Sequence, residues 1–255
     1  MARRKHKGIV WVTGASSGIG RALALRLARN GWQVAASARS AAALEELAAD
    51  QEGSIFPYPL DVTDMARTKQ VHAEIELAMG SIDMAVLAAG TYKRDGAFDF
   101  RAQVAQSMIA VNLQGTCNAL EPLLDSMMSR RRGKIAIMAS VAGYNGLPGG
   151  ATYGATKSAL NNLCEAMKPE AERRNVSLSV INPGFVDTPL TARNDFPMPF
   201  LISADEAAAS IEKGLEDGRY EIIFPWKMKL AIKFLHALPA MLRFTITRRL
   251  VRAPD

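Results

Sequence analysis

The chain has 255 residues, of which 49% are hydrophobic and 22% charged, a composition typical of a folded domain with a sizeable core. Its formal charge of +6 is uneven, because residues 1–7 carry +4 and residues 222–255 carry +6, so the rest sums to 6 − 10 = −4. Basic ends on an acidic body argue against a nucleic-acid partner, and two cysteines, Cys117 and Cys164, are too few for a disulfide framework.

Targeting signals are not expected in this sequence. The charged start MARRKHK is followed by too few apolar residues for a signal peptide. The longest uncharged run, residues 135–156, contains five glycines among polar residues and is therefore no membrane span. We expect a cytoplasmic protein with free thiols.

Short apolar runs alternate with amphipathic stretches along the whole chain. The apolar runs predict strands at 9–13, 33–37, 55–59, 84–88, 134–139, 177–182 and 221–224. Between them lie helical patterns near 19–29, 41–50, 64–79, 101–130, 153–173 and 204–215. Strict alternation predicts one α/β domain with a Rossmann-type, doubly wound, parallel seven-stranded sheet and helices on both faces. We divide the chain into a basic tail (1–7), this domain (8–225) and a basic amphipathic extension (226–255).

The first strand runs into the glycine-rich stretch TGASSGIG. Gly14 permits a sharp turn, Gly18 lets the backbone approach a pyrophosphate, and Gly20 allows close packing of helix on strand. The N-terminus of the following helix offers unpaired N–H groups to the same anion. A glycine-rich turn without a ligand is the alternative. The residues expected to bind a dinucleotide here are Gly14, Ser16, Ser17, Gly18, Ile19 and Gly20.

The end of the second strand bears on the choice of cofactor. Position 38, where a carboxylate would bind the ribose of NAD, is Ala38, and Arg39 follows it. A guanidinium can hold a 2′-phosphate, and no acidic side chain in this stretch opposes it, so the sequence favours NADP, with NAD as the alternative. Arg39 could also be a solvated residue stacking on adenine. After the third strand, Asp61 and Val62 could contact the adenine, or belong to a helix start ending at Asp64.

Further motifs follow in order along the chain. Asn112 lies in VNLQG, Ser140 ends IAIMAS, Tyr153 precedes Lys157 by four residues, and a Pro-Gly pair stands in INPGFVDTP. With the glycine loop, these motifs resemble the short-chain dehydrogenase/reductase family, in its single-domain branch, over roughly residues 8–224. The resemblance implies that the cofactor is also contacted by Ala89, Gly90, Tyr153, Lys157, Pro183, Gly184, Val186 and Thr188.

One departure from the family pattern follows the fourth strand. The family often has Asn-Asn-Ala-Gly there, whereas this chain has LAAG at residues 87–90. A side-chain contact that supports the central strand is therefore expected to be lost. An asparagine at this place transfers no proton, so we expect catalysis to survive.

The resemblance also suggests a catalytic set of Asn112, Ser140, Tyr153 and Lys157. Residues four apart on a helix share a face, so Tyr153 and Lys157 project together. A phenol has a pKa near 10, and Lys157 with an oxidised nicotinamide is expected to lower it by roughly 2–3 units. Ser140 would hold the substrate carbonyl, and Asn112, at a local break in its helix, would hold a water that links Lys157 to solvent. Taken singly, Asn112 could also be a buried amide within a helix, Ser140 a hydroxyl at the end of a strand, and Tyr153 an aromatic residue of the core.

Two segments after Thr188 carry weaker signals. Phe196, Met198, Phe200 and Leu201 lie in a stretch that forms a flap in this family, and they indicate a lipophilic substrate or simple packing of the flap. The extension 226–255 mixes apolar and basic residues, and Pro239 divides it into two helical segments. It could lie on an anionic membrane surface, dock on the body or meet a partner subunit.

Together these features predict an NADP(H)-dependent oxidoreductase that interconverts a carbonyl and a secondary alcohol by hydride transfer. The alternative is a catalytically silent NAD(P)-binding regulator or scaffold. His6, His72 and His236 are expected to be solvated, and no metal is expected. By analogy with the family, we expect a homodimer or homotetramer that pairs through the helices at 101–130 and 153–173.

Overall fold

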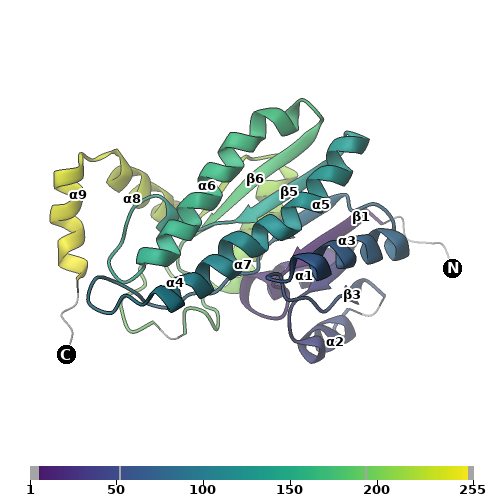
Figure 1. Cartoon of the computed structure of the whole chain (residues 1–255), viewed down its shortest axis with the longest axis horizontal. Coiled ribbons are helices and arrows are strands. Elements are labelled where there is room, and N and C mark those ends of the chain that lie inside the picture. The colour runs from purple at the N-terminus through teal and green to yellow at the C-terminus, as the bar shows by residue number, and fades with distance from the viewer. Residues whose placement is uncertain (1–5, 52, 193, 252–255) are drawn as a thin grey trace.

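The computed structural model describes residues 6–51, 53–192 and 194–251, and in them seven parallel strands form one sheet (Figure 1). The strand order is β3-β2-β1-β4-β5-β6-β7, which confirms the predicted doubly wound, Rossmann-type α/β fold. The strands are β1 Gly8–Thr13, β2 Trp32–Ser37, β3 Ile55–Pro57, β4 Met84–Leu87, β5 Gly133–Met138, β6 Val176–Pro183 and β7 Glu221–Phe224. The third strand ends at Pro57, two residues before the expected end, although the Tyr58 N–H still donates to the Ala36 carbonyl at 2.8 Å.

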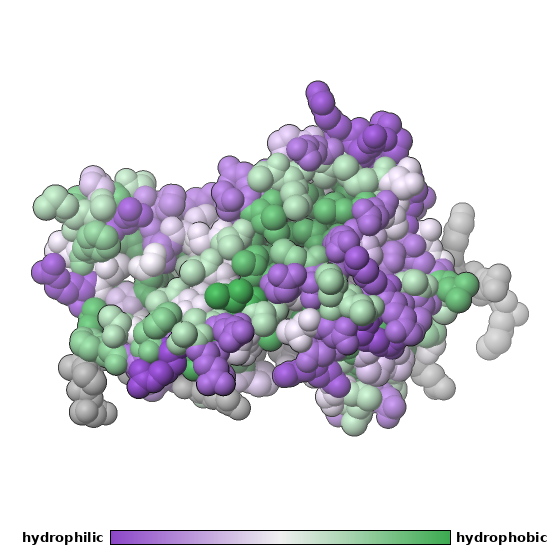
Figure 2. Space-filling view, in the orientation of Figure 1, coloured by the Kyte–Doolittle hydropathy of each residue, from purple (hydrophilic) through white to green (hydrophobic). Residues whose placement is uncertain are grey.

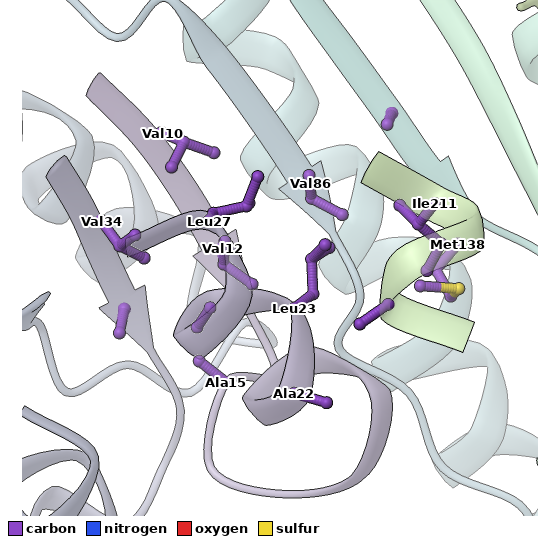
Figure 3. Packing of buried hydrophobic residues seen from close by; sticks show 14 of the residues in the cluster. Val10, Val12, Ala15, Ala22, Leu23, Leu27, Val34, Val86, Met138 and Ile211 are labelled. Carbon is purple, nitrogen blue, oxygen red and sulfur yellow. The ribbon is translucent and has the colours of Figure 1, made fainter. Parts of the chain in front are cut away.

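Helices cover both faces of the sheet (Figure 1). They are α1 Gly18–Arg29, α2 Ala41–Ala49, α3 Met65–Met79, α4 Ala102–Ile109, α5 Gly115–Arg130, α6 Ala151–Glu172, α7 Ala204–Glu216, α8 Trp226–Ala237 and α9 Ala240–Thr247. Alternate residues of a strand point to opposite faces. In β1, Val12 therefore packs with Leu23 and Leu27 of α1 (Figure 3), whereas the fully buried Trp11 belongs to the core under α3, α5 and α6.

Side-chain caps define where three of the described α-helices begin, namely α2, α3 and α7. Ser40 accepts a hydrogen bond from the Ala43 N–H at the start of α2, and Asp64 accepts one from the Arg67 N–H at 2.9 Å at the start of α3. Asp64 is thus the helix cap that the sequence suggested. At the start of α1, in contrast, Ser17 makes no such side-chain bond. The N–H groups of that helix remain available.

The helix expected at 101–130 is broken in the structure. A π-helical turn at Ala110–Gln114 separates α4 from α5, and Asn112 lies in it, fully buried. The Thr116 hydroxyl donates to the Asn112 carbonyl at 2.8 Å and so adds a side-chain hydrogen bond to this irregular turn. The local break that was expected at Asn112 is therefore present.

The chain ends in two short helices at the carboxyl edge of the sheet. Pro239 separates α8 from α9, as predicted, and Met228 and Ile232 of α8 pack on Val141. At the other end Lys7 pairs with Glu216 at 3.2 Å. Residues 1–5 of the predicted tail and 252–255 of the predicted extension lie outside the described residues. Among the described helices, none has the length and apolarity needed to cross a bilayer.

Candidate active site

The strand order reverses between β1 and β4, and the glycine loop lies at this reversal. Gly14 has φ +72°, and a Cβ on it would lie 2.8 Å from the Ala89 backbone. A Cβ on Gly20 would lie 2.2 Å from the Gly14 carbonyl oxygen. A Cβ on Gly18 would lie 3.1 Å from Thr188. Glycine is therefore required at these positions, and the loop after β6 lies directly beside the glycine loop.

This loop has the features of a pyrophosphate site. The first turn of α1 contains no acidic residue, and no side chain caps it. Its N–H groups and the positive end of the helix dipole therefore face the place where the strand order reverses. Ser16, Ser17 and Ile19 lie in the same turn, so the predicted dinucleotide-binding residues of this loop are all together.

The segment after β4 is held although its expected asparagines are missing. The Thr13 hydroxyl accepts hydrogen bonds from the N–H groups of Ala88 and Ala89, at 3.1 and 3.3 Å. The Asn112 amide accepts from the Thr91 N–H at 2.7 Å and donates to the Thr91 carbonyl at 2.9 Å. The side chains of Thr13 and Asn112 therefore hold the segment that follows β4, where the family pattern would place asparagine side chains.

Asn112 and Lys157 both lie close to Gly90. A Cβ on Gly90 would be 3.5 Å from Asn112 Oδ1 and 3.7 Å from Lys157 Nζ. Asn112 Nδ2 also donates to Thr156 Oγ1 at 3.2 Å, so the amide joins α6 to the segment after β4. The structure thus gives Asn112 a positioning contact, and its water-holding role stays a prediction.

Ser140, Tyr153 and Lys157 come together at the carboxyl end of β5. Lys157 Nζ donates to the Met138 carbonyl at 2.7 Å and lies 5.6 Å from the centroid of the Tyr153 ring. The Ser140 hydroxyl interacts with the Tyr153 phenol and accepts a hydrogen bond from the Ala142 N–H at 3.1 Å. The three groups expected to act on a substrate therefore share one small volume beside the glycine loop.

Burial is the largest cause of the pKa shifts of both Tyr153 and Lys157. Burial raises the pKa of Tyr153 to about 12, and the opposing effect of Ser140 is smaller. Burial also lowers the pKa of Lys157 to about 8. The expected lowering of the phenol pKa is therefore absent from the protein without a nucleotide. At neutral pH the phenol holds its proton, and Lys157, 3% exposed, is close to its own titration.

A chain of hydrogen bonds that the sequence did not suggest supports Ser140. Asn182 Oδ1 accepts from the Ser140 N–H at 3.1 Å, and its Nδ2 donates to the Tyr144 hydroxyl at 3.1 Å. The Tyr144 hydroxyl in turn donates to the Glu221 carboxylate. The position of Asn182, directly before the Pro-Gly pair, was the one available signal. Tyr92, also missed, packs edge-on against Tyr153 with ring centroids 5.2 Å apart.

The residues expected to select the cofactor lie at the ends of β2 and β3. Ala38 is buried and Arg39 is exposed. Hydrogen bonds from Thr63 hold the pKa of Asp61 below its usual range, and the charge of Arg39 adds a smaller effect. An acidic side chain from the end of β3 therefore lies near Arg39, although the stretch around Arg39 itself contains none. Asp61 accepts from the Thr63 N–H at 2.9 Å, so it forms the turn before α3.

Next to Asp61, Val62 is buried against α5. Its carbonyl accepts from Asn118 Nδ2 at 2.8 Å. A Cβ on Gly115 would lie 2.6 Å from its side chain. The position of the backbone at Val62 is thus fixed by α5.

The loop after β6 is ordered by its own hydrogen bonds. A Cβ on Gly184, which follows Pro183, would lie 2.9 Å from Met228, so α8 packs closely here. The Thr191 hydroxyl donates to the Val186 carbonyl at 2.5 Å and accepts from the Thr188 N–H at 3.1 Å. Val186 and Thr188, which are expected to contact the cofactor, therefore make their hydrogen bonds to Thr191 of the same loop in this structure.

The flap that follows is joined to the rest of the domain at two points. Phe196 packs on Phe185 with ring centroids 5.9 Å apart. Arg94 pairs with Asp195 at 3.1 Å and so joins the flap to the segment after β4. Phe200, by contrast, remains 44% exposed. Packing explains part of the apolar character of the flap, but not all of it.

The histidine prediction was wrong for one residue. His72 is buried, its ring lies 6.2 Å from that of Trp11, and burial lowers its pKa. It faces the Ser126 hydroxyl at 3.3 Å, inside the core and away from the glycine loop. Within the described ranges, no group of His, Cys, Asp and Glu is arranged to hold a metal ion. Cys117 and Cys164 are free thiols, as expected.

Comparison with known proteins agrees with this geometry. The model of the short chain dehydrogenase family matches residues 8–196. An uncharacterized oxidoreductase of Myxococcus xanthus is 35% identical and covers 94% of this chain and 96% of its own. The 3-oxoacyl-[acyl-carrier-protein] reductase FabG of Thermotoga maritima is 32% identical over 71% of this chain and 75% of its own. The structure of ElxO with NADP bound has a TM-score of 0.77 and 25% identity, and covers 86% of this chain and 97% of that one.

Proposed function

This chain belongs to the short-chain dehydrogenase family, and we propose that it uses NADP(H) to interconvert a carbonyl and a secondary alcohol. The observation that carries the proposal is the meeting of Ser140, Tyr153 and Lys157 beside an uncapped, glycine-rich helix start. A bound nicotinamide supplies or accepts the hydride. The protein supplies the proton and the orientation.

Each of these side chains has a role that follows from its surroundings. Tyr153 holds its proton at neutral pH and can donate it to the oxygen of a carbonyl as that oxygen becomes an alkoxide. The Ser140 hydroxyl donates a hydrogen bond to the same oxygen and orients the substrate. Its place is set by Asn182, which binds the Ser140 backbone.

Lys157 has two tasks in this proposal. Nζ gives one hydrogen bond to the Met138 carbonyl and keeps two protons for the ribose hydroxyls of the cofactor. When protonated, it also stabilises the phenolate that Tyr153 becomes after donating. Nζ lies 5.6 Å from the centroid of the ring, and two unit charges about 5–6 Å apart attract each other by about 3 kcal/mol, or about two pKa units, at an effective dielectric constant near 20.

The direct test is turnover of NADPH with a panel of ketones and long-chain aldehydes, followed by absorbance at the nicotinamide band. We expect oxidation of NADPH with at least one member of the panel. The relative named as a 3-oxoacyl reductase favours the direction of carbonyl reduction. Binding of NADPH without turnover across the panel would instead favour a silent regulator.

Cofactor preference depends on Arg39 in this proposal. Arg39 is exposed at the end of β2, and the related ElxO structure contains NADP. We expect Arg39→Ala to weaken NADPH binding by roughly 10–100-fold, the effect of losing a charge-assisted hydrogen bond, with little change for NADH. The dissociation constants of both nucleotides should be measured by titration, with Arg29→Ala as a control at another exposed arginine. An unchanged ratio of the two constants would disprove the phosphate assignment.

Pairing with a second copy through the fourth to sixth helices also belongs to the proposal. Figure 2 shows apolar side chains gathered between α5 and α6, and half-buried residues there include Leu124 and Met167. An apolar hollow of about 450 Å³ between α4 and α6 is lined by Phe100 and Ile109, both about half exposed. An apolar face of this kind supports a homodimer or homotetramer.

A further inference from the structure

Helix α8 is apolar on two opposite sides. On one side Met228 and Ile232 are buried against the body. On the other side Trp226, Leu230 and Phe234 recur every four residues, so they form one stripe along the helix. These three side chains are 66%, 62% and 67% exposed. An amphipathic surface helix has one apolar face, so the second one indicates a further contact.

Helix α9 extends this apolar surface. Figure 1 shows α9 at the far end of the molecule from the N-terminus, projecting beyond the other helices. Thr247 is the one residue of α9 that is buried, and Arg243 joins the helix to the body by a hydrogen bond to Asn145 Oδ1 at 3.2 Å. Its exposed apolar residues are Met241, Leu242, Phe244 and Ile246.

Positive charge surrounds these apolar side chains. Residues 226–251 contain six Lys or Arg and no Asp or Glu. Lys227 lies on one flank of the stripe and Lys229 on the other, and both are exposed. In Figure 2, hydrophobic and hydrophilic side chains lie next to one another over α8 and α9, at the left of the view.

We propose that α8 and α9 form a docking surface for an anionic lipid bilayer, with the Trp226–Leu230–Phe234 stripe in the headgroup region and the cations on the lipid phosphates. An in-plane amphipathic helix with Lys and Arg beside Trp, Phe and Leu has the composition for such binding. A second copy of this chain is the less suitable occupant. Lys233 is paired with Glu221 at 2.6 Å, and a symmetric contact through this surface would bring the remaining five cations against five others.

The docking surface is continuous with the flap. Lys227 Nζ lies 5.8 Å from the ring centroids of both Trp226 and Phe200. Leu201, next in the flap, is 44% exposed, as Phe200 is. Docking through α8 would therefore bring the flap to the bilayer surface. The proposal itself rests on exposure and charge, and does not depend on turnover.

The first experiment is cosedimentation of the full chain with vesicles of phosphatidylcholine alone or mixed equally with phosphatidylglycerol. We expect binding to the mixed vesicles and little to phosphatidylcholine alone. Salt at about 1 M shortens the Debye length to about 3 Å and should release most of the protein. Trp226 is the exposed tryptophan, since Trp11 is buried and Trp32 half-buried, so its emission should shift to shorter wavelength on binding. Equal binding to both vesicles, or no binding to either, would overturn the proposal.

Two pairs of matched variants identify the surface. Lys227→Glu/Lys229→Glu should weaken binding to the mixed vesicles by at least about 25-fold, at about fivefold per cation removed. Lys134→Glu/Arg174→Glu changes the net charge equally at exposed positions of the opposite sheet edge and should bind almost as the parent does. Trp226→Ser/Phe234→Ser should weaken binding at least tenfold, whereas Met65→Ser/Leu77→Ser, on α3, should not.

Circular dichroism and the thermal midpoint verify that each variant is folded, and sedimentation velocity gives the oligomeric state. The charge variants keep the test decisive if the serine variant is unstable. Equal weakening by the target and the control pairs would refute a local docking surface. Loss of a dimer in Trp226→Ser/Phe234→Ser without loss of vesicle binding would assign the stripe to a second copy instead.

Discussion

Replacing Tyr153 with Phe is expected to lower kcat by roughly 10²–10⁴-fold, the usual contribution of a positioned proton donor. Phenylalanine keeps the ring that packs edge-on against Tyr92, so the helix and the cofactor pocket should be unchanged. The dissociation constant for NADPH should accordingly stay within about threefold of the parent value. Single-turnover oxidation of NADPH measures the loss, and a separate fluorescence titration measures binding.

The matched control is Tyr92→Phe. It removes a neighbouring hydroxyl that donates to the Gly149 carbonyl at 3.0 Å, so we expect a loss of less than about tenfold. The rate of carbonyl reduction in the parent should fall at alkaline pH as Tyr153 loses its proton, and the residual activity of Tyr153→Phe should lack this dependence. If both variants lost the same activity, or if Tyr153→Phe lost none, another group would be the proton donor.

The second large effect is expected from Lys157→Met, which should inactivate the protein and stabilise it. Burial lowers the pKa of Lys157 to about 8 in the folded protein, whereas an unfolded lysine titrates near 10.5. Below pH 8 the fold must bury an ammonium, which costs about 3 kcal/mol. Methionine removes this cost but also the hydrogen bond to Met138, worth about 1 kcal/mol. The variant should therefore gain about 2 kcal/mol in unfolding free energy at pH 7.

The gain should depend on pH in a defined window. Between pH 8 and 10.5 the unfolded chain binds more protons at Lys157 than the folded protein does, so the stability of the parent rises with pH relative to the variant. The gain of the variant should thus be largest below pH 8 and be lost as the pH approaches 10.5, where the parent, which keeps the hydrogen bond to Met138, should be the more stable of the two by about 1 kcal/mol. Urea unfolding of the nucleotide-free proteins across this range measures it.

Lys168→Met is the control for this prediction. Lys168 lies on the same helix, and its Nζ is 5.5 Å from the centroid of the Tyr220 ring, but it forms a more exposed pair with Glu172. Its replacement should change the unfolding free energy by less than about 1 kcal/mol. NADPH oxidation should fall at least about 100-fold in Lys157→Met and stay near the parent level in Lys168→Met. A stability gain that is the same at all pH values would contradict the buried charge as its cause.

The sequence determined the elements that local chemistry controls. Alternating apolar runs and amphipathic stretches predict a parallel, doubly wound sheet, because a strand covered on both faces needs apolar residues at successive positions. Gly14 and Gly20 could be assigned to a tight strand-to-helix turn, because the apolar run before them and the helical pattern after them are both visible in the sequence. Pro239 divided the C-terminal extension for an equally local reason, its missing N–H.

The tertiary structure alone decided the environment of the candidate site. Tyr153 and Lys157 are four residues apart, but their pKa values depend on how strongly the folded chain removes them from water, and without a nucleotide this burial raises the pKa of the phenol. His72 is buried because α3 turns it toward Trp11, which no pattern near His72 reveals. The Asn182–Tyr144–Glu221 chain joins residues as many as 77 positions apart. Such contacts exist only where strand order and helix packing bring distant residues together, so burial and long-range hydrogen bonds were beyond the reach of the sequence.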